Sequence, residues 1–365
     1  MHALHVTPHI SRLGGGVWSV VRELAGRRGD TVVGMEDAHP EDADGLDAVR
    51  LRRRGPRIFA YMPELRRTVA ERVGDGVVHL HGGLRMLANV SALRGARDAG
   101  APVILSPHGS LYPQMLAKHR GRKAVANFLY DRKLLESVDA FHATCTAELE
   151  TIRAAGLTQP VAVVSPGVDV PATVARIDGP RTLLYLGLFD RKKGLVRLAE
   201  TWRTLHREFA NWRLVLAGPD QDGHLAEVRT TLGDAPAEFP GPVYGDAKSE
   251  LFQAADVFVL PSDWENFGVV VGEALAHARP VIAPANSPWD WLADENAGWQ
   301  VDADNLEPVL RQALSTERVD LSAIGARGRQ TIDRAYTWPV ALIRFAETYH
   351  WLRGGTRPAF VDHNC

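Results

Sequence analysis

Residues 265–280 read ENFGVVVGEALAHARP, and this stretch decides the fold because it leads from a predicted strand into a predicted helix. The apolar run at 257–260 is typical of a buried strand in a parallel sheet. Helix-favouring residues cover 268–277, and an Arg-Pro pair is expected to stop the helix. The sequence therefore predicts strand, loop and helix, with Glu265 at the mouth of the helix and Glu273 one to two turns inside it.

The chemistry of this stretch lies in its two carboxylates and in the start of the helix. Free amides at the positive end of a helix dipole suit an oxyanion or a sugar hydroxyl. A carboxylate farther along can accept both hydroxyls of a ribose, because it has two acceptor oxygens and no donor. Glu265 and Glu273, with Asn266-Phe267-Gly268 after the first, resemble the E-x7-E signature of retaining GT-B glycosyltransferases of family 4, the group 1 glycosyl transferases. That family includes enzymes of lipopolysaccharide and polysaccharide assembly.

Domain organisation follows from length and from alternating patterns. The chain has 365 residues, which suits two domains of about 150–180 residues each. Short apolar runs alternate with helical patterns, which predicts two parallel α/β sheets. We expect a first domain at 1–166, a second at 167–337, a helix at 338–353 and a frayed tail at 354–365. The candidate strands are 4–7, 77–81, 103–106, 141–144, 161–165, 183–188, 214–217, 257–260 and 281–283.

Composition excludes several classes of protein. The formal net charge is −2, which excludes a strongly basic nucleic-acid binder. The two cysteines, Cys145 and Cys365, cannot build a disulfide framework, which fits a reducing cytoplasm. No run approaches the roughly 20 apolar residues that span a bilayer. We therefore expect a cytoplasmic protein that is soluble or bound peripherally to the inner face of the membrane.

A glycine run opens the first predicted helix. Gly14-Gly15-Gly16 follows the first candidate strand, and glycines there let backbone amides approach an anion closely. A flexible turn between strand and helix is the structural alternative. The spacing does not match the G-x-G-x-x-G dinucleotide fingerprint, which argues against NAD. In the family that the chain resembles, this loop meets the donor pyrophosphate and the acceptor, which implies roles for Gly15 and Gly16.

Three consecutive cations follow the first strand of the second predicted domain. Arg191-Lys192-Lys193 precedes Gly194, and such a group can neutralise a diphosphate or can be a solvated basic turn. The segment resembles the family's G-R-x-x-x-x-K-G element, which assigns Lys193 to the diphosphate. The family's arginine position is Leu188 here, so Arg191 or Lys192 is a candidate to replace its charge.

Histidines end two strands of the first predicted domain. His108 follows a candidate strand, at the carboxyl edge where open α/β sheets bind ligands. The resemblance implies that His108 lies near the donor sugar and orients it, with a backbone carbonyl stabilising positive charge at the anomeric carbon. His79 and His81 share one face of a strand, and we expect them to hold a loop. With no third ligand evident, we expect no metal there.

Two other features each have a non-functional and a functional interpretation. The triplets at 42–44 and 302–304 resemble the D-x-D metal motif of another transferase fold, and we discount them because the E-x7-E context indicates metal-independent chemistry. Basic residues gather between Arg50 and Arg72 and between Lys118 and Lys123. They form either a solvated surface or an attachment face for an anionic membrane or acceptor, worth ~1 kcal/mol per cation near a charged bilayer. We place Trp289, Trp291 and Trp299 in the structure rather than on a sugar.

The resemblance extends over nearly the whole chain and implies a GT-B fold: two Rossmann-like domains facing across a cleft, with a C-terminal helix crossing back to the first. It implies transfer of a sugar from a nucleotide-diphosphate sugar to a glycan or lipid-linked acceptor, with retention, in cell-surface polysaccharide assembly. No cofactor or metal is expected. The expected catalytic residues are His108, Glu265 and Lys193, and the expected donor-binding residues are Gly15, Gly16, Arg191, Lys192, Lys193, Asn266, Phe267, Gly268 and Glu273.

Two alternatives stay open from the sequence. The same fold serves nucleotide-sugar epimerases and hydrolases, and Leu188 in place of the arginine also permits a non-catalytic binding module. The donor base and sugar, the acceptor and the oligomeric state are not fixed by these motifs. Loops near 218–222 and 244–248 are expected to contact the base.

Overall fold

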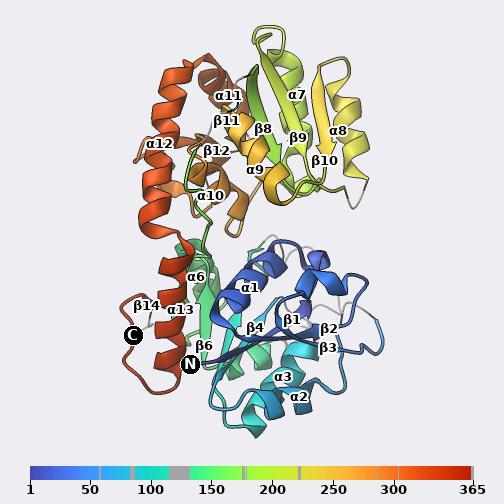
Figure 1. The fold of residues 1–365 in the computed structure, drawn as a ribbon, viewed down its shortest axis with the longest axis vertical. Helices are drawn as coiled ribbons and strands as arrows, with labels where there is room; N and C mark the ends of the chain where they lie inside the picture. Colours follow the sequence, from blue (N-terminus) through green and yellow to red (C-terminus); the bar gives the residue numbers. More distant parts are fainter. Residues whose placement is uncertain are drawn as a thin grey trace. The chain divides into compact units, whose positions relative to one another are not determined.

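The computed structural model forms two compact α/β units, each with its own parallel sheet (Figure 1). The first unit comprises Met1–Gly167 and Pro339–Cys365, and the second comprises Val168–Trp338. The structure describes residues 1–56, 59–82, 87–113, 115, 132–174, 177, 179–220, 223–285, 287–302 and 304–362.

The sheet of the first unit has the strand order β14-β7-β6-β5-β4-β1-β2-β3. Its neighbours pair in parallel, except that β14 pairs with β7 in the antiparallel sense. The strands are β1 (Ala3–His9), β2 (Thr31–Met35), β3 (Asp47–Leu51), β4 (Val77–His81), β5 (Val103–Ser106), β6 (Ala140–Ala143), β7 (Val161–Val163) and β14 (Val361–Asp362). Its helices are η1 (Arg12–Gly14), α1 (Gly15–Arg28), η2 (Pro40–Ala43), α2 (Leu65–Arg72), α3 (Leu87–Asp98), α6 (Thr146–Ala154) and, apart from its first residue, α13 (Trp338–Leu352).

The sheet of the second unit has the order β10-β9-β8-β11-β12-β13, and the neighbouring strands are parallel. Its strands are β8 (Arg181–Leu186), β9 (Trp212–Ala217), β10 (Ala237–Gly241), β11 (Val257–Val259), β12 (Val281–Pro284) and β13 (Gly298–Val301). Its helices are η4 (Arg191–Lys193), α7 (Leu195–Leu205), α8 (His224–Leu232), α9 (Gly245–Ala254), α10 (Val269–Ala276), η5 (Asp290–Leu292), α11 (Leu306–Ser315) and α12 (Arg318–Ala335).

In each sheet, successive strands are added first on one side of the starting strand and then on the other. Open parallel sheets bind ligands at the point where this change occurs. In the second unit the change lies between β8 and β11, and in the first it lies between β1 and β4. The loops that leave the carboxyl ends of β8, β11 and β1 carry η4, the E-x7-E stretch and the glycine run, and His81 is the last residue of β4. The fold therefore places the motifs of the sequence at the ligand-binding edge of each sheet.

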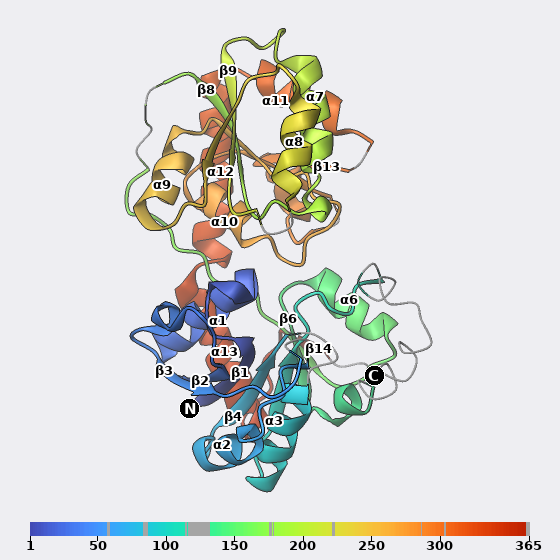
Figure 2. The same ribbon diagram turned by 90° about the vertical axis from the view of Figure 1, so that its right-hand side faces the viewer.

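Apolar burial explains why these segments form central strands. In β11 and β12 every residue is buried, and the same holds for β4, β5 and β6. Such runs belong inside a sheet covered on both faces. Figures 1 and 2 show helices on both sides of each sheet, with α2 and α3 side by side in the first unit. Among the described residues, no helix combines the length and apolar character needed to cross a bilayer.

The predicted parallel α/β architecture is confirmed, and so is the return of the C-terminal helix to the first unit. Helix α13 packs on that sheet through Tyr349, whose hydroxyl lies 2.7 Å from Nδ1 of His79. The expectation of a frayed tail is wrong at Val361 and Asp362, because these residues pair with β7 and close that edge of the sheet. Strands β2, β3, β10, β13 and β14 were not among the candidates.

Candidate active site

The loops after β8 and β11 lie against each other in the second unit. Gly194 has a φ of 68°, and a Cβ there would collide with the carbonyl oxygen of Pro261. The amide of Asp263 donates to the carbonyl of Lys192 at 2.9 Å. Asp190 caps the short helix η4 by accepting from the amide of Lys192 at 3.0 Å. A glycine at position 194 is therefore what lets the basic turn approach the loop that carries Glu265.

Lys193 and Glu265, which were predicted to belong to the same site, form an ion pair. The ammonium group of Lys193 donates to Oε1 of Glu265, and the hydroxyl of Ser262 donates to the same oxygen at 2.7 Å. The two side chains are only 15% and 11% exposed. Each charge has little solvent around it, so separating the pair would leave both charges poorly solvated. The two side chains therefore hold each other in a fixed orientation.

The start of α10 is shaped by Gly268 and by a buried tryptophan. Gly268 has a φ of 70° and forms the N-cap of the helix without a side-chain hydrogen bond. The indole of Trp289 donates to the carbonyl of Phe267 at 2.6 Å, and the two rings lie 5.0 Å apart. Trp289 is fully buried, so its expected structural role is confirmed. Asn266 lies between Glu265 and Phe267, so the contacts of Phe267 with Trp289 fix this stretch of backbone against the core.

Glu273 lies one turn inside α10 and meets a lysine that the sequence analysis did not pair with it. Lys248 Nζ lies 2.6 Å from the Glu273 carboxylate, and each side chain is about one quarter exposed, at 27% and 26%. Lys248 belongs to the first turns of α9, so the expected loop at 244–248 is largely helical. Residues 221–222 of the other expected base-contacting loop lie outside the described residues.

The remaining cations of the basic turn face other partners. Arg191 is 80% exposed and pairs with Glu227 at 2.9 Å. The ammonium of Lys192 lies 5.6 Å from the centre of the Trp264 ring. At Leu188, which holds the family's arginine position, the carbonyl accepts from the hydroxyl of Tyr185 at 2.7 Å. Lys193 is therefore the cation of this turn that contacts Glu265.

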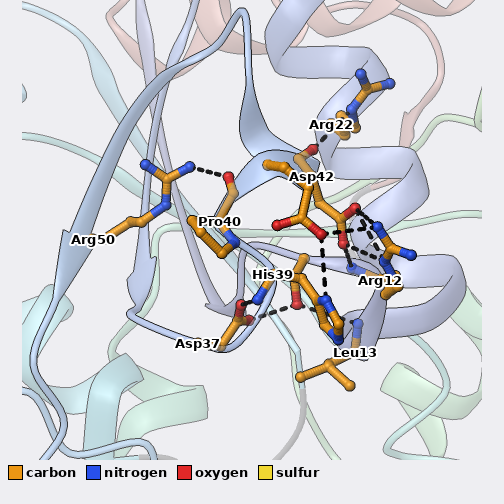
Figure 3. Close-up of polar contacts among 10 residues, drawn as sticks. Arg12, Leu13, Arg22, Asp37, His39, Pro40, Asp42 and Arg50 are labelled. Carbon is orange, nitrogen blue, oxygen red and sulfur yellow. Dashed lines mark hydrogen bonds and ion pairs between the residues drawn. The ribbon is translucent and has the colours of Figure 1, made fainter.

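In the first unit, the residues just before the glycine run make polar contacts with the segment at 37–42, and Figure 3 draws contacts of Arg12, Asp37 and Asp42. Arg12 binds the carboxylate of Asp42 through its guanidinium, at 2.6 Å for the shortest contact, and through its backbone amide at 2.6 Å. Ser11 donates to Asp37 at 2.6 Å. The hydrogen bond from Arg12 lowers the pKa of Asp42 below its ordinary value. Asp42, which belongs to the D-x-D-like triplet at 42–44, is thus paired with an arginine.

Gly15 and Gly16 form the first turn of α1, which begins before the predicted start at Val17. Gly15 has a φ of 57°, and a Cβ built on either glycine would meet no atom within 4 Å. The space beside both glycines is therefore open, and binding of an anion there stays a prediction.

His108 follows β5 and has a positive φ of 50°, which is uncommon for a residue other than glycine. The next amide, that of Gly109, donates to Glu148 at 2.7 Å and fixes the turn. Nε2 of His108 lies 3.1 Å from Nδ1 of His81, and His108 keeps part of its surface exposed. Burial lowers the pKa of His108, with a further contribution from His142, so the imidazole is neutral at physiological pH.

His79 and His81 are joined by a third ring that the sequence analysis missed. His5 on β1 approaches both, and the ligand atoms of these three histidines lie within 4.8 Å of one another. The signal in the sequence was weak, because His5 lies on β1, far along the chain from His79 and His81 on β4. His79 also binds Ser106 on the next strand at 2.6 Å, which agrees with a role in holding the structure.

The structure comparisons define the class of protein first. The fold is similar to that of sucrose-phosphate synthase from Thermosynechococcus elongatus, with a TM-score of 0.77 at 21% identity, over 96% of this chain and 99% of that one. It is also similar to WaaG, a glycosyltransferase involved in lipopolysaccharide biosynthesis, with a TM-score of 0.71 at 18% identity, over 97% and 100%. The chain has the GT-B fold of glycosyltransferases.

The sequence comparisons then give the family. Residues 14–171 match the model described as Glycosyltransferase Family 4, and residues 180–316 match that described as Glycosyl transferases group 1. The chain is 26% identical to GDP-mannose:cellobiosyl-diphosphopolyprenol alpha-mannosyltransferase of Xanthomonas campestris, over 88% of this chain and 85% of that protein. It is 28% identical to GDP-mannose-dependent alpha-mannosyltransferase of Mycobacterium tuberculosis, over 95% and 94%. The chain belongs to the group 1, family 4 glycosyltransferases and is an enzyme of that class.

Proposed function

We propose that this glycosyltransferase moves mannose from GDP-mannose to a saccharide carried on a lipid diphosphate, with retention of configuration and without a metal, in the assembly of a cell-surface polysaccharide. The observation that carries the proposal is the Lys193–Glu265 pair at the start of α10, with Glu273 one turn farther on. Relatives named as GDP-mannose-dependent mannosyltransferases support the choice of donor.

Each residue has a separate task in this proposal. Glu273 accepts hydroxyls of the donor ribose, and Lys193 neutralises the diphosphate, with Arg191 and Lys192 adding positive potential. Glu265 and the backbone of residues 266–268 bind hydroxyls of the transferred sugar. Gly15 and Gly16 of the first unit meet the pyrophosphate and the acceptor, and His108 orients the sugar.

The reaction exchanges one bond at the anomeric carbon. The bond from that carbon to the diphosphate oxygen breaks, and the acceptor oxygen forms a new bond on the same face. The acceptor's proton goes to the departing phosphate oxygen, so the products are GDP and the extended saccharide. Positioning and stabilisation of the leaving diphosphate carry the catalysis, and Lys193 supplies positive charge to the leaving group in this proposal.

Binding and transfer can be tested in sequence with the purified protein. Ligand-observed NMR against UDP-, GDP-, ADP- and dTDP-sugars should detect GDP-mannose, and Glu273→Ala should abolish that signal. Transfer to a lipid-diphosphate saccharide should persist in EDTA and give a product with the anomeric configuration of the donor. Preference for another nucleotide, loss of activity in EDTA or inversion at the anomeric carbon would contradict the corresponding part of the proposal.

The proposed acceptor implies work at a membrane surface. Phe59 and Tyr61 are 41% and 38% exposed, and exposed arginines at 52–54 precede them in the segment expected to meet anionic lipid. Met62 and Ala60 of the same segment are buried, so they do not contribute to this exposed surface. The second basic cluster, between Lys118 and Lys123, lies outside the described residues.

Vesicle co-sedimentation tests this attachment. The wild type should bind vesicles of anionic lipid at low salt, and a variant with Phe59→Ser and Tyr61→Ser should bind less. A protein that stays in the supernatant with anionic vesicles at low salt would remove the membrane from the proposal.

A further inference from the structure

Four fully buried histidines lie side by side at the centre of the first unit, and a fifth, His108, extends the group to the candidate site. The rings of His79 and His81 stack with centres 4.0 Å apart, and those of His81 and His108 stack at 5.4 Å. The buried members, His5, His79, His81 and His142, are each at most 2% exposed. A neutral imidazole has one donor nitrogen and one acceptor nitrogen, so each ring in such a group must take one of two tautomers.

One chain of hydrogen bonds leads from a carboxylate to His108. Nε2 of His5 lies 3.3 Å from Oδ2 of Asp30. Nδ1 of His5 lies 2.9 Å from Nε2 of His81, and Nδ1 of His81 lies 3.1 Å from Nε2 of His108. Both nitrogens of His5 and of His81 are thus engaged within the chain.

Asp30 fixes the direction of this chain because its carboxylate can only accept. The guanidinium of Arg28 donates to Oδ2 of Asp30 at 2.7 Å, and the amide of Ala3 donates to Oδ1 at 2.9 Å. Burial acts to raise the pKa of Asp30, but the hydrogen bond from His5 and the charge of Arg28 hold that pKa below its ordinary value. An ionised Asp30 therefore requires a proton on Nε2 of His5.

The proton positions then follow one ring at a time. With its proton on Nε2, neutral His5 must accept at Nδ1, so His81 donates from Nε2. His81 must then accept at Nδ1, so His108 donates from Nε2 and keeps a lone pair on Nδ1. The reverse order would point two lone pairs at each other between His5 and Asp30.

Two other states of the group fit the contacts less well. A doubly protonated His5 would reverse the later bonds, but it would place a second buried cation beside Arg28, and burial lowers the pKa of His5. A metal on His5, His79 and His81 would have to take nitrogens that already make hydrogen bonds to Asp30, Tyr349, Ser106 and the neighbouring rings. Stacked rings at 4.0 Å also do not point their nitrogens at a common centre.

A second chain of hydrogen bonds in the same unit is also anchored by an acceptor, but by a backbone carbonyl and not by Asp30. Nε2 of His142 lies 2.8 Å from the carbonyl of Val164, which can only accept. Ser106 therefore donates to Nδ1 of His142 at 2.6 Å and accepts from Nε2 of His79 at 2.6 Å. The hydroxyl of Tyr349 completes the chain by donating to Nδ1 of His79 at 2.7 Å. This chain is independent of Asp30 and provides an internal control.

We propose that Asp30 and His5 are positioning residues that fix His108, through His81, in the tautomer with its proton on Nε2, so that Nδ1 of His108 can only accept a hydrogen bond. The role of that acceptor rests on the proposed function: it receives a hydroxyl of the sugar or of the acceptor and cannot donate to it. The tautomer itself does not depend on which sugar is transferred.

The test is a two-bond ¹H–¹⁵N correlation spectrum of the full chain labelled with ¹⁵N-histidine, with His108 assigned by its loss in His108→Gln. The wild type should show His108 protonated at Nε2 and unprotonated at Nδ1. His5→Phe keeps a ring of similar size and leaves Asp30 with Arg28, but removes the acceptor for His81. In that variant His108 should become a mixture of tautomers while His142 is unchanged, and kcat should fall in proportion to the fraction with the proton on Nε2.

The outcomes separate this inference from the proposed function. A wild-type His108 protonated at Nδ1 or at both nitrogens would overturn it, as would a stoichiometric metal in the purified protein. So would an unchanged His108 spectrum in His5→Phe. If that variant does not fold, the wild-type spectrum still decides. A correct tautomer in a protein that transfers no mannose would leave the chain from Asp30 intact and reject the proposed function alone.

Discussion

Lys248 of α9 holds the carboxylate of Glu273 of α10 at 2.6 Å, although the two residues are 25 positions apart in the chain. Both side chains are about one quarter exposed, at 27% and 26%, so solvent screens their attraction. An ion pair of this exposure contributes about 0.2–1 kcal/mol. The contact therefore orients Glu273 more than it stabilises the second unit.

This relationship predicts unequal effects of two substitutions on donor use. Lys248→Met should raise the KM for the donor by less than about fivefold, because it removes only an orienting contact. Glu273→Ala should raise it by more than about tenfold, because hydrogen bonds to a charged group are worth about 1.5–3 kcal/mol. Steady-state kinetics can compare both with Glu250→Ala, an exposed control on the same helix. A larger effect of Lys248→Met than of Glu273→Ala would contradict the assignment of Glu273 to the ribose.

Lys193→Ala should lower kcat by about 10²–10³-fold, the range for removing one donor that stabilises charge developing in the transition state. The same variant leaves Glu265 without the cation that now shares its Oε1. Arg207, which is 80% exposed on the surface of the second unit, provides the control Arg207→Ala. Single-turnover rates distinguish the chemical step from binding. A loss below about threefold in Lys193→Ala would remove this residue from the site.

Leu188→Arg should raise kcat/KM about tenfold, because the neighbouring cations are directed elsewhere. Arg191 pairs with Glu227, and Lys192 lies over the ring of Trp264. The matched control is Leu188→Met, which changes the side chain without adding charge. If Leu188→Arg shows no gain, then Arg191 or Lys192 turns toward the diphosphate when the donor binds.

The buried histidines predict a first unit that is sensitive to mild acid. Burial lowers the pKa of His5, His79, His81, His108 and His142, in the case of His142 to about 4. Below the ordinary value near 6.5 the unfolded chain binds protons that the folded unit does not. The free energy of unfolding therefore decreases as the pH is lowered, by up to about 1.4 kcal/mol per pH unit for each histidine. The pKa of Asp30 is also lowered in the folded unit, so Asp30 decreases the free energy of unfolding further only below about pH 4.

Hydrogen exchange can measure this loss in both units of one sample. Opening free energies of β4 amides should fall steeply between about pH 7 and pH 5, and those of β9 should fall less. The second unit serves as the control because His277 is its one described histidine with a lowered pKa. Parallel losses in β4 and β9 would show that the histidines do not govern acid sensitivity.

The sequence predicted that Lys193 and Glu265 belong to one site, and the structure brings their side chains together. This was predictable because the signals are local. Lys193 and Glu265 lie in loops that each follow an apolar strand, and the parallel sheet then brings neighbouring strand ends together. The pairing of Lys193 with Glu265 is a direct result of that topology. Lys248 was not foreseen as a partner, because its contact with Glu273 depends on how two helices lie on the sheet.

The parts that were missed depend on contacts between distant segments or on weak strand patterns. His5 and Asp30 belong to β1 and to the turn before β2, and neither has a pattern that predicts a neighbour on β4. Strand β10 contains Pro240 and Gly241 and lies at the edge of its sheet, where proline is tolerated but the strand signal is weak. Strand β14 is only a Val-Asp pair, and its partner β7 lies in a distant part of the chain.

The contact between His79 and Tyr349 spans 270 positions of the chain. A ribosome must therefore synthesise the whole second unit before the hydroxyl that binds His79 can reach the sheet around it. Until then Val168–Trp338 has all of its own residues, while the core of the earlier-made unit still lacks α13. The unit that is translated first is thus the unit whose residues are completed last, and a nascent chain stalled before Tyr349 lacks the hydroxyl that donates to Nδ1 of His79.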